Sequence, residues 1–138
     1  MSKYIHKVHY YETDKMGITH HSNYIRFMEE ARMNYLAESG FTMTRLEAEG
    51  ISSPVVSLTC DYKTPTTYDD EIEIEAKLTR YSGVKISLSY VMKNLRTGAV
   101  VAEASSVHCF IDTAGRPVAV KKYCPDLDGV MKSILEEA

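Results

Sequence analysis

One segment near the amino terminus, ETDKMGITHHSNY at positions 12–24, gathers more reactive side chains than a simple turn needs. It contains Asp14, Gly17 and the adjacent His20 and His21. An aspartate carboxylate is ionised at neutral pH, so it can attack a carbonyl carbon or take a proton from water. A glycine three residues later lets the backbone turn sharply and approach a ligand closely. The combination predicts a site that can act on a carbonyl group.

This segment leads directly into a predicted helix over positions 22–39. The apolar side chains along it recur three and four residues apart, which is typical of a helix with one buried face. They are Tyr24, Ile25, Phe27, Met28, Ala31, Tyr35 and Leu36. Polar residues four apart form the opposite stripe, namely Arg26, Glu30, Asn34 and Glu38. Ser22 or Asn23 can cap the start of the helix, and Gly40 can end it in a left-handed conformation.

The remaining elements predict a single α+β domain over positions 1–138. Aromatic and β-branched residues favour a strand at 4–11, and a short helical turn is expected at 43–49. Further strands are predicted at 55–62, 71–78, 85–92 and 99–112, separated by short turns, and a weak helix at 126–136. We therefore expect a curved antiparallel sheet of about five strands wrapped around one long central helix.

Composition excludes several classes of function. The chain carries 16 basic and 19 acidic residues, with no long block of either sign, which argues against bulk nucleic-acid binding. Three cysteines without a paired spacing, and a polar amino terminus, predict a reduced, cytoplasmic protein without a signal peptide. The chain has no apolar run of the roughly 20 residues that cross a bilayer, so a soluble protein is expected.

The opening segment resembles the signature of hot-dog-fold acyl-CoA thioesterases, most closely the 4-hydroxybenzoyl-CoA thioesterase type. The matching pattern is Asp14-x-x-Gly17-x-x-x-His21-x-Asn23-Tyr24, followed by Glu30-Ala31-Arg32. A second match is Tyr62-x-x-Pro65-x-x-x-Asp69-Asp70, and a weaker third is FIDTAGRPV at positions 110–118. The sequence departs from the commonest pattern at Lys15-Met16, where small residues are usual before the glycine.

The resemblance implies a hot-dog fold, two protomers paired into one continuous sheet, and an active site at their interface. A homotetramer made of two such dimers is common in the family. The resemblance also implies that the Asp14 carboxylate is catalytic and that the backbone amide of His21 polarises the thioester carbonyl. The expected substrate-binding residues are Gly17, His20, Ser22, Asn23 and Tyr24.

The expected substrate is an acyl-CoA, with an acyl carrier protein as an alternative carrier and no separate cofactor. The phosphates of coenzyme A call for basic residues near the site. The candidates are Lys63, Lys77, Arg80, Lys85, Arg96, Lys121 and Lys122. Two other classes stay open: a non-catalytic acyl-CoA-binding regulator, and a hot-dog acyl-thioester hydratase. The hydratase is disfavoured because Asp14 is not followed by the Asn-Pro of that family's pattern.

Plainer explanations exist for the reactive residues. Asp14 can simply brace a turn, and His20 and His21 can shape the loop. Glu29 and Glu30 are similar to the helix glutamate that some hot-dog subfamilies use in place of the loop aspartate. Arg26 lies within one turn of both, and a surface ion pair with it is favoured for Glu30.

No metal site and no cysteine nucleophile are expected. His6 and His9 would face opposite sides of a regular strand, and the neighbouring His20 and His21 diverge. His108 is expected to be structural. The cysteines, Cys60, Cys109 and Cys124, lack a context that would activate a thiolate.

Overall fold

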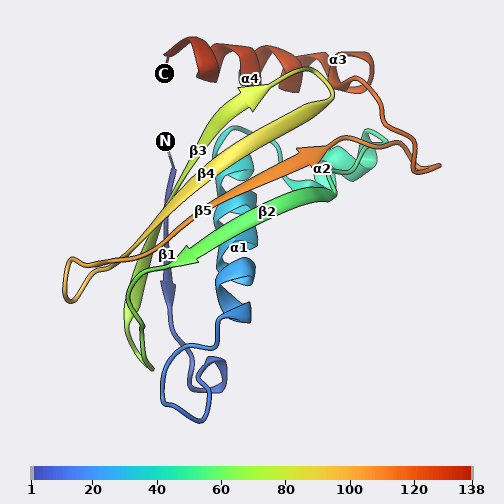
Figure 1. Cartoon of the computed structure of the whole chain (residues 1–138). Coiled ribbons are helices and arrows are strands. Elements are labelled where there is room, and N and C mark those ends of the chain that lie inside the picture. The colour runs from blue at the N-terminus through green and yellow to red at the C-terminus, as the bar shows by residue number, and fades with distance from the viewer. Residues whose placement is uncertain (1, 138) are drawn as a thin grey trace.

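The computed structural model describes residues 2–137 and shows a curved, five-stranded antiparallel sheet that wraps around one long helix (Figure 1). The strands are β1 (Ser2–Lys7), β2 (Val55–Tyr62), β3 (Glu71–Tyr81), β4 (Lys85–Asn94) and β5 (Val100–Cys109). The helices are α1 (Ser22–Glu38), α2 (Met43–Ala48), α3 (Val120–Tyr123) and α4 (Pro125–Glu137), with a 3-10 turn η1 (Tyr10–Glu12). The strand order is β1-β3-β4-β5-β2, so β1 and β2 form the two edges. The hot-dog fold predicted from the sequence is confirmed.

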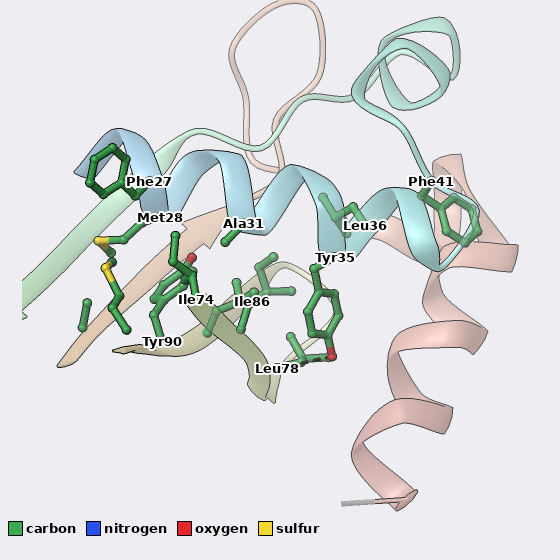
Figure 2. Packing of buried hydrophobic residues seen from close by; sticks show 14 of the residues in the cluster. Phe27, Met28, Ala31, Tyr35, Leu36, Phe41, Ile74, Leu78, Ile86 and Tyr90 are labelled. Carbon is green, nitrogen blue, oxygen red and sulfur yellow. Dashed lines mark hydrogen bonds between the residues drawn. The ribbon is translucent and has the colours of Figure 1, made fainter. Parts of the chain in front are cut away.

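Helix α1 is the hydrophobic centre of the molecule. Its buried side includes Phe27 and Ala31, and the concave face of the sheet packs against it (Figure 2). Phe27 is fully buried, so its truncation to alanine would cost about 3–5 kcal/mol of stability. Gly40 has a φ of 90° and ends the helix as predicted. Ile25 is the exception to the predicted apolar face, because 41% of its surface is exposed.

Strand β3 supplies the clearest agreement between sequence pattern and structure. Its alternating apolar residues all lie in the core, while the charged residues between them point away. The buried set is Ile72, Ile74, Ala76 and Leu78. A period of two places every second side chain on one face, and here that face covers α1.

The amino-terminal strand is shorter than predicted. We expected a strand at 4–11, but β1 ends at Lys7 and the chain turns into η1. The Val8 amide donates to the Asp70 carbonyl, and the His9 amide donates to the Glu12 carboxylate, so this backbone leaves the ladder with β3. The final helix was predicted close to its observed bounds, whereas the short α3 before it was not predicted.

Strand β2 has an unusual surface for a strand. All of its residues except Cys60 are exposed, including Val55, Val56, Leu58 and Tyr62. It pairs only with β5, which leaves its other edge open. Among the residues that the structure describes, no helix is long and apolar enough to cross a membrane.

Candidate active site

The segment that carries Asp14 forms a tight hairpin. Thr13 and Thr19 pair across its base, and the Asp14 amide donates to the Ile18 carbonyl at 2.9 Å. The Gly17 amide donates back to the Asp14 carbonyl at 2.9 Å. Gly17 has a φ of 80°, a left-handed conformation that glycine adopts without strain. The predicted sharp turn at Gly17 is therefore confirmed.

The Asp14 carboxylate braces the turn with one oxygen and has its second oxygen available for another contact. Its Oδ1 accepts a hydrogen bond from the Met16 amide at 2.8 Å, so the side chain braces the turn. No other described residue forms a hydrogen bond to this half-buried carboxylate. One oxygen is thus fixed by the turn while the other can face a substrate or a water molecule.

The start of α1 follows this hairpin directly. The His20 amide donates to the Glu12 carbonyl at 2.8 Å, and the Ser22 amide donates to His20 Nδ1 at 3.3 Å. The His21 amide, by contrast, has no acceptor among the described residues. A free amide at the positive end of a helix stabilises negative charge on a nearby oxygen.

The predicted helix cap was wrong. The capping residue is His21, whose side chain makes no capping hydrogen bond, and Ser22 and Asn23 already lie within the helix. The His20 ring takes over part of this task, because its Nδ1 lies 2.8 Å from Ser22 Oγ as well as accepting from the Ser22 amide. The His20 and His21 rings lie against each other at a tilt of 31°, with their centroids 4.2 Å apart.

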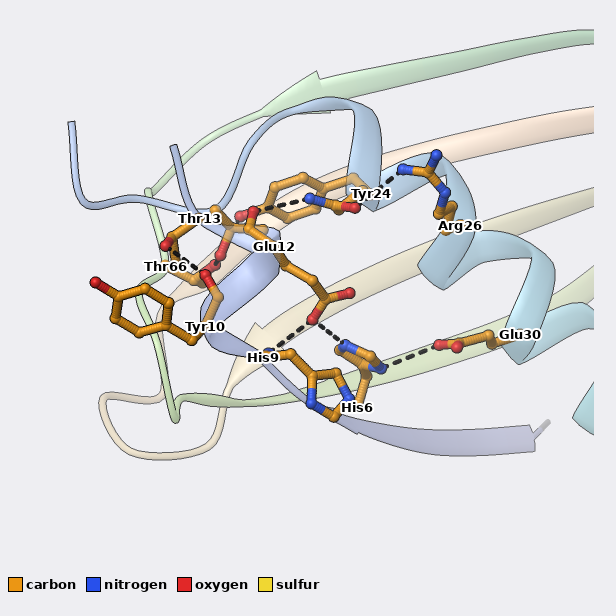
Figure 3. A network of polar contacts seen from close by, with 11 residues as sticks. His6, His9, Tyr10, Glu12, Thr13, Tyr24, Arg26, Glu30 and Thr66 are labelled. Atoms are coloured by element: carbon orange, nitrogen blue, oxygen red, sulfur yellow. Dashed lines mark hydrogen bonds and ion pairs between the residues drawn. The ribbon is translucent and has the colours of Figure 1, made fainter. Parts of the chain in front are cut away.

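Asn23 and Tyr24 are buried beneath the hairpin and its flanking residues and form hydrogen bonds to them. Asn23 is buried, and its Nδ2 donates to the Glu12 carbonyl at 2.8 Å (Figure 3). Tyr24 is also buried, and its hydroxyl lies 2.9 Å from Thr66 Oγ1. Both residues were expected to bind substrate, but their polar groups already have protein partners. Their observed contacts position the loop against α1.

The last residue of β2 and the segment after it hold the other side of the hairpin. The Thr19 amide donates to the Thr66 carbonyl at 2.8 Å, and the Thr67 hydroxyl donates to the Gly17 carbonyl at 2.8 Å. The Tyr62 hydroxyl donates to the His21 carbonyl at 3.1 Å. Burial raises the pKa of Tyr62 to about 12, so it remains a donor at neutral pH. We assigned these residues no role from the sequence, although the motif starting at Tyr62 was a signal for them.

Asp70 anchors that segment to the sheet. Its carboxylate accepts from the Thr67 amide at 3.0 Å, from Asn94 Nδ2 at 3.1 Å and from Arg96 Nε at 3.1 Å. Burial by itself raises the pKa of Asp70, but these hydrogen bonds and the Arg96 charge hold it below its ordinary value. Arg96, one of the candidates for binding coenzyme A phosphates, is therefore paired with a protein carboxylate.

Glu30 has a different partner from the one predicted. Its Oε2 lies 3.0 Å from His6 Nδ1, while Arg26 donates to Asn23 Oδ1 at 3.1 Å. The predicted Glu30–Arg26 ion pair was therefore wrong. The reason is that β1 brings His6 to the side of α1 that carries Glu30.

A cavity of about 110 Å³ lies between α1 and the strands β2 and β5. It is lined by Ile25, Arg26, Met28, Glu29, Arg32, Val55, Leu58 and Ser106. Arg32 and Ser106 are buried, whereas Ile25 and Val55 are exposed, so the cavity opens beside the β2 edge. The nearest carboxylate to the Arg32 guanidinium is that of Glu29, at 3.9 Å.

A buried polar chain lies behind this cavity. The Tyr90 hydroxyl lies 2.7 Å from Ser106 Oγ, which lies 2.7 Å from His108 Nε2. Burial and the charge of Arg32 lower the pKa of His108 to about 4, so the ring is neutral at pH 7. Burial also raises the pKa of the Cys60 thiol, which disfavours a thiolate there.

Comparison with known proteins adds independent information. Residues 8–132 match the family model described as the Thioesterase-like superfamily. A protein of Aquifex aeolicus (strain VF5), provisionally named an esterase, is 35% identical over 119 residues, which cover 86% of this chain and 91% of that protein. The Acyl-CoA thioester hydrolase YbgC of Escherichia coli O6:H1 is 28% identical over 116 residues, which cover 84% of this chain and 87% of that protein. The solved structure of the DHNA-CoA thioesterase from Staphylococcus aureus has a TM-score of 0.94 at 28% identity, covering 98% of this chain and 91% of that one.

Proposed function

The chain belongs to the thioesterase-like superfamily, and on that basis we propose that Asp14 and the His21 amide hydrolyse the thioester of an acyl-CoA. Relatives named as an acyl-CoA thioester hydrolase and a DHNA-CoA thioesterase align over most of its length. The protein is accordingly a thioester hydrolase. The observation that supports these two residues is their arrangement: a carboxylate with a free oxygen and an unbonded helix-terminal amide lie at the two ends of one braced loop.

The His21 amide would stabilise the oxygen of the thioester carbonyl. This oxygen becomes negatively charged when the carbonyl carbon is attacked, and the dipole of the 17-residue helix α1 favours that charge. One preorganised donor of this kind contributes about 3–4 kcal/mol in other enzymes. The hydrogen bond from Tyr62 to the His21 carbonyl helps to fix this peptide group.

Asp14 would supply the attacking group by one of two routes. In the first, its carboxylate oxygen bonds to the carbonyl carbon, the C–S bond breaks, and the coenzyme A thiolate leaves. Water then hydrolyses the resulting anhydride and restores the carboxylate. In the second, Asp14 takes a proton from water as that water attacks the same carbon, and the proton passes to the leaving thiolate. A single turnover in ¹⁸O-water followed by mass spectrometry detects the first route when water attacks the Asp14 carbon of the anhydride, because only then does label enter the Asp14 peptide.

The complete site would form between two protomers. Strand β2 offers an open edge with exposed apolar side chains, including Val56 and Leu58. Pairing of β2 with β2 of a second copy would continue the sheet, cover these residues and enclose the cavity beside α1. A homodimer of this kind, with a dimer of dimers as the larger assembly, fits these features.

The acyl group would occupy this cavity. One protomer provides apolar contacts from Met28 and Leu58 together with the buried Arg32 and Ser106. The carrier would be coenzyme A, or the same phosphopantetheine arm on an acyl carrier protein, held near the loop by basic side chains. The acyl-CoA is the substrate, and the reaction as proposed needs no separate cofactor.

A substrate panel tests this function directly. Short, medium, long and aromatic acyl-CoAs are incubated with the protein, and loss of each thioester is followed by chromatography, because the chain's three cysteines react with thiol reagents. We expect hydrolysis of at least one class, with water as the only co-substrate. Tight binding without turnover would favour the regulator, and hydration of an enoyl-CoA without release of coenzyme A would favour the hydratase.

A further inference from the structure

Two histidines and a glutamate converge at the base of the hairpin that carries Asp14. Because β1 ends at Lys7, His9 does not continue the strand, and its ring lies 5.5 Å from that of His6. The expectation that these two histidines face opposite sides was therefore wrong. One potential ligand atom from each of His6, His9 and Glu12 lies within 4.8 Å of the others (Figure 3).

The three residues differ in burial and in the contacts they make. His6 and Glu12 are buried and held in place, with His6 Nε2 at 2.8 Å from Glu12 Oε1 and the His9 amide donating to the same oxygen at 2.7 Å. The His9 side chain is exposed, and its ring stacks on that of Tyr11 with a centroid separation of 5.0 Å. Two of the candidate ligands are thus fixed side by side in the interior, and the third lies at the surface, where an ion can enter from solvent.

A fourth residue orients the buried histidine. Glu30 Oε2 lies 3.0 Å from His6 Nδ1, which leaves Nε2 directed at Glu12. Histidines that bind metal ions usually donate their other ring N–H to a carboxylate in this way, and this partner fixes the ring and its tautomer. The cluster therefore contains both a set of donors and the outer contact that such donors need.

The charges also favour a dication. The carboxylates of Glu12 and Glu30 share one imidazole, and the nearby Arg26 is directed to Asn23 instead. A divalent ion bound at His6 Nε2 would carry two positive charges to balance the two carboxylates. Nitrogen and oxygen ligands around Zn²⁺ lie about 3.3–3.6 Å apart. An entering ion would therefore separate His6 Nε2 from Glu12 Oε1, which are 2.8 Å apart here, and would draw in the exposed His9 ring.

We propose that His6, His9 and Glu12 bind one divalent transition-metal ion of the zinc type, with Glu30 as the carboxylate that orients His6. Such an ion would fasten the loop to α1, because the Glu12 carbonyl accepts the hydrogen bonds of the His20 amide and of Asn23 Nδ2. The ion would have a structural task beside the site and would take no part in thioester chemistry. This assignment is independent of the proposed hydrolysis.

Titration of chelator-treated protein with Zn²⁺ and with Co²⁺ tests this assignment. We expect one ion per chain by calorimetry, release of a proton on binding, and a cobalt spectrum without sulfur-to-metal charge transfer. His9→Ala alters only an exposed side chain and should abolish saturable binding. Glu30→Gln should weaken binding by about 10–100-fold while leaving one site. His21→Ala is the matched control, since it removes one histidine of the other pair and should bind normally.

Three results would overturn the metal site. The first is no saturable binding by the wild type at metal concentrations up to on the order of 1 mM. The second is normal binding by His9→Ala. The third is loss of binding in His21→Ala, which would place the ion at the His20–His21 pair. None of these results depends on whether the protein hydrolyses a thioester, so metal binding and catalysis can fail separately.

Discussion

At the scale of single residues, the hairpin gives Asp14 a turn-bracing task and leaves it able to perform the proposed catalytic one. The hydrogen bond from the Met16 amide fixes the carboxylate, which is the turn-bracing role that a plain aspartate would play. The same bond leaves the second oxygen free, which a nucleophile or general base needs. Because both tasks use the same residue type, the sequence alone could indicate that Asp14 matters but could not separate them.

His108 provides a residue-scale prediction about acid stability. Its pKa is lowered from 6.5 to about 4 by burial and by Arg32, so between those values the unfolded chain binds a proton that the folded chain does not. The free energy of unfolding should therefore fall as the pH drops through this window and level off below it.

His108→Gln keeps a polar contact toward Ser106 but removes this proton. The measurement is urea unfolding of both proteins between pH 5 and pH 6.5. The slope of the unfolding free energy against pH should correspond to about one proton fewer taken up on unfolding in the variant than in the wild type. Equal slopes for the two proteins would mean that the ring is not held neutral in the core.

At the scale of elements, the loop and α1 act as one unit. Backbone bonds at Asp14 and Gly17 shape the hairpin, and those of His20 join it to the helix. Periodicity predicted α1 and β3 well because the three- and two-residue repeats reflect burial on one face. It could not predict where β1 ends, since that depends on hydrogen bonds to Asp70, far away in the sequence.

Gly17→Ala tests how much the turn matters. No atom lies within 4 Å of a Cβ at this position, so the cost comes from the left-handed backbone alone and should be about 1–2 kcal/mol. We also expect a lower hydrolysis rate, because Asp14 is held by this turn.

Gly129→Ala is the control, as Gly129 lies exposed in α4 with equal free space but no positive φ. That change should stabilise the protein by up to about 1 kcal/mol. Denaturant unfolding compares the two variants, and a Gly17→Ala protein as stable as the wild type would contradict the assigned conformation.

At the scale of the whole molecule, we expect the β2 edge of the sheet, and not the β1 edge, to pair with a second copy of the chain. The hot-dog arrangement could be predicted from sequence because its motifs and strand patterns are local. The roles of Tyr62, Thr66 and Thr67 could not, because they arise only when the segment after β2 folds against the hairpin. The β2 edge, exposed in a single chain, is where a second copy would complete the site.

Val56→Lys tests this assembly against Ile5→Lys. Each apolar side chain is 51% exposed, but Val56 lies on the β2 edge and Ile5 on the opposite edge, β1. A lysine on a pairing edge blocks strand addition, so Val56→Lys should become monomeric and lose activity, whereas Ile5→Lys should do neither. Light scattering and the hydrolysis rate are the readouts. A dimer that persists in Val56→Lys would place the interface elsewhere.

The most direct measurement is the rate of acyl-CoA hydrolysis by Asp14→Asn beside Asp69→Asn. Asp69 is a suitable control because its exposed carboxylate pairs with Lys7 and its φ of 75° is tolerated by asparagine. If Asp14 is the catalytic carboxylate, kcat/KM of its variant should fall by about 100-fold or more with the fold intact, while Asp69→Asn stays within about twofold of the wild type. A folded Asp14→Asn protein that keeps most of the wild-type rate would show that Asp14 only braces the turn.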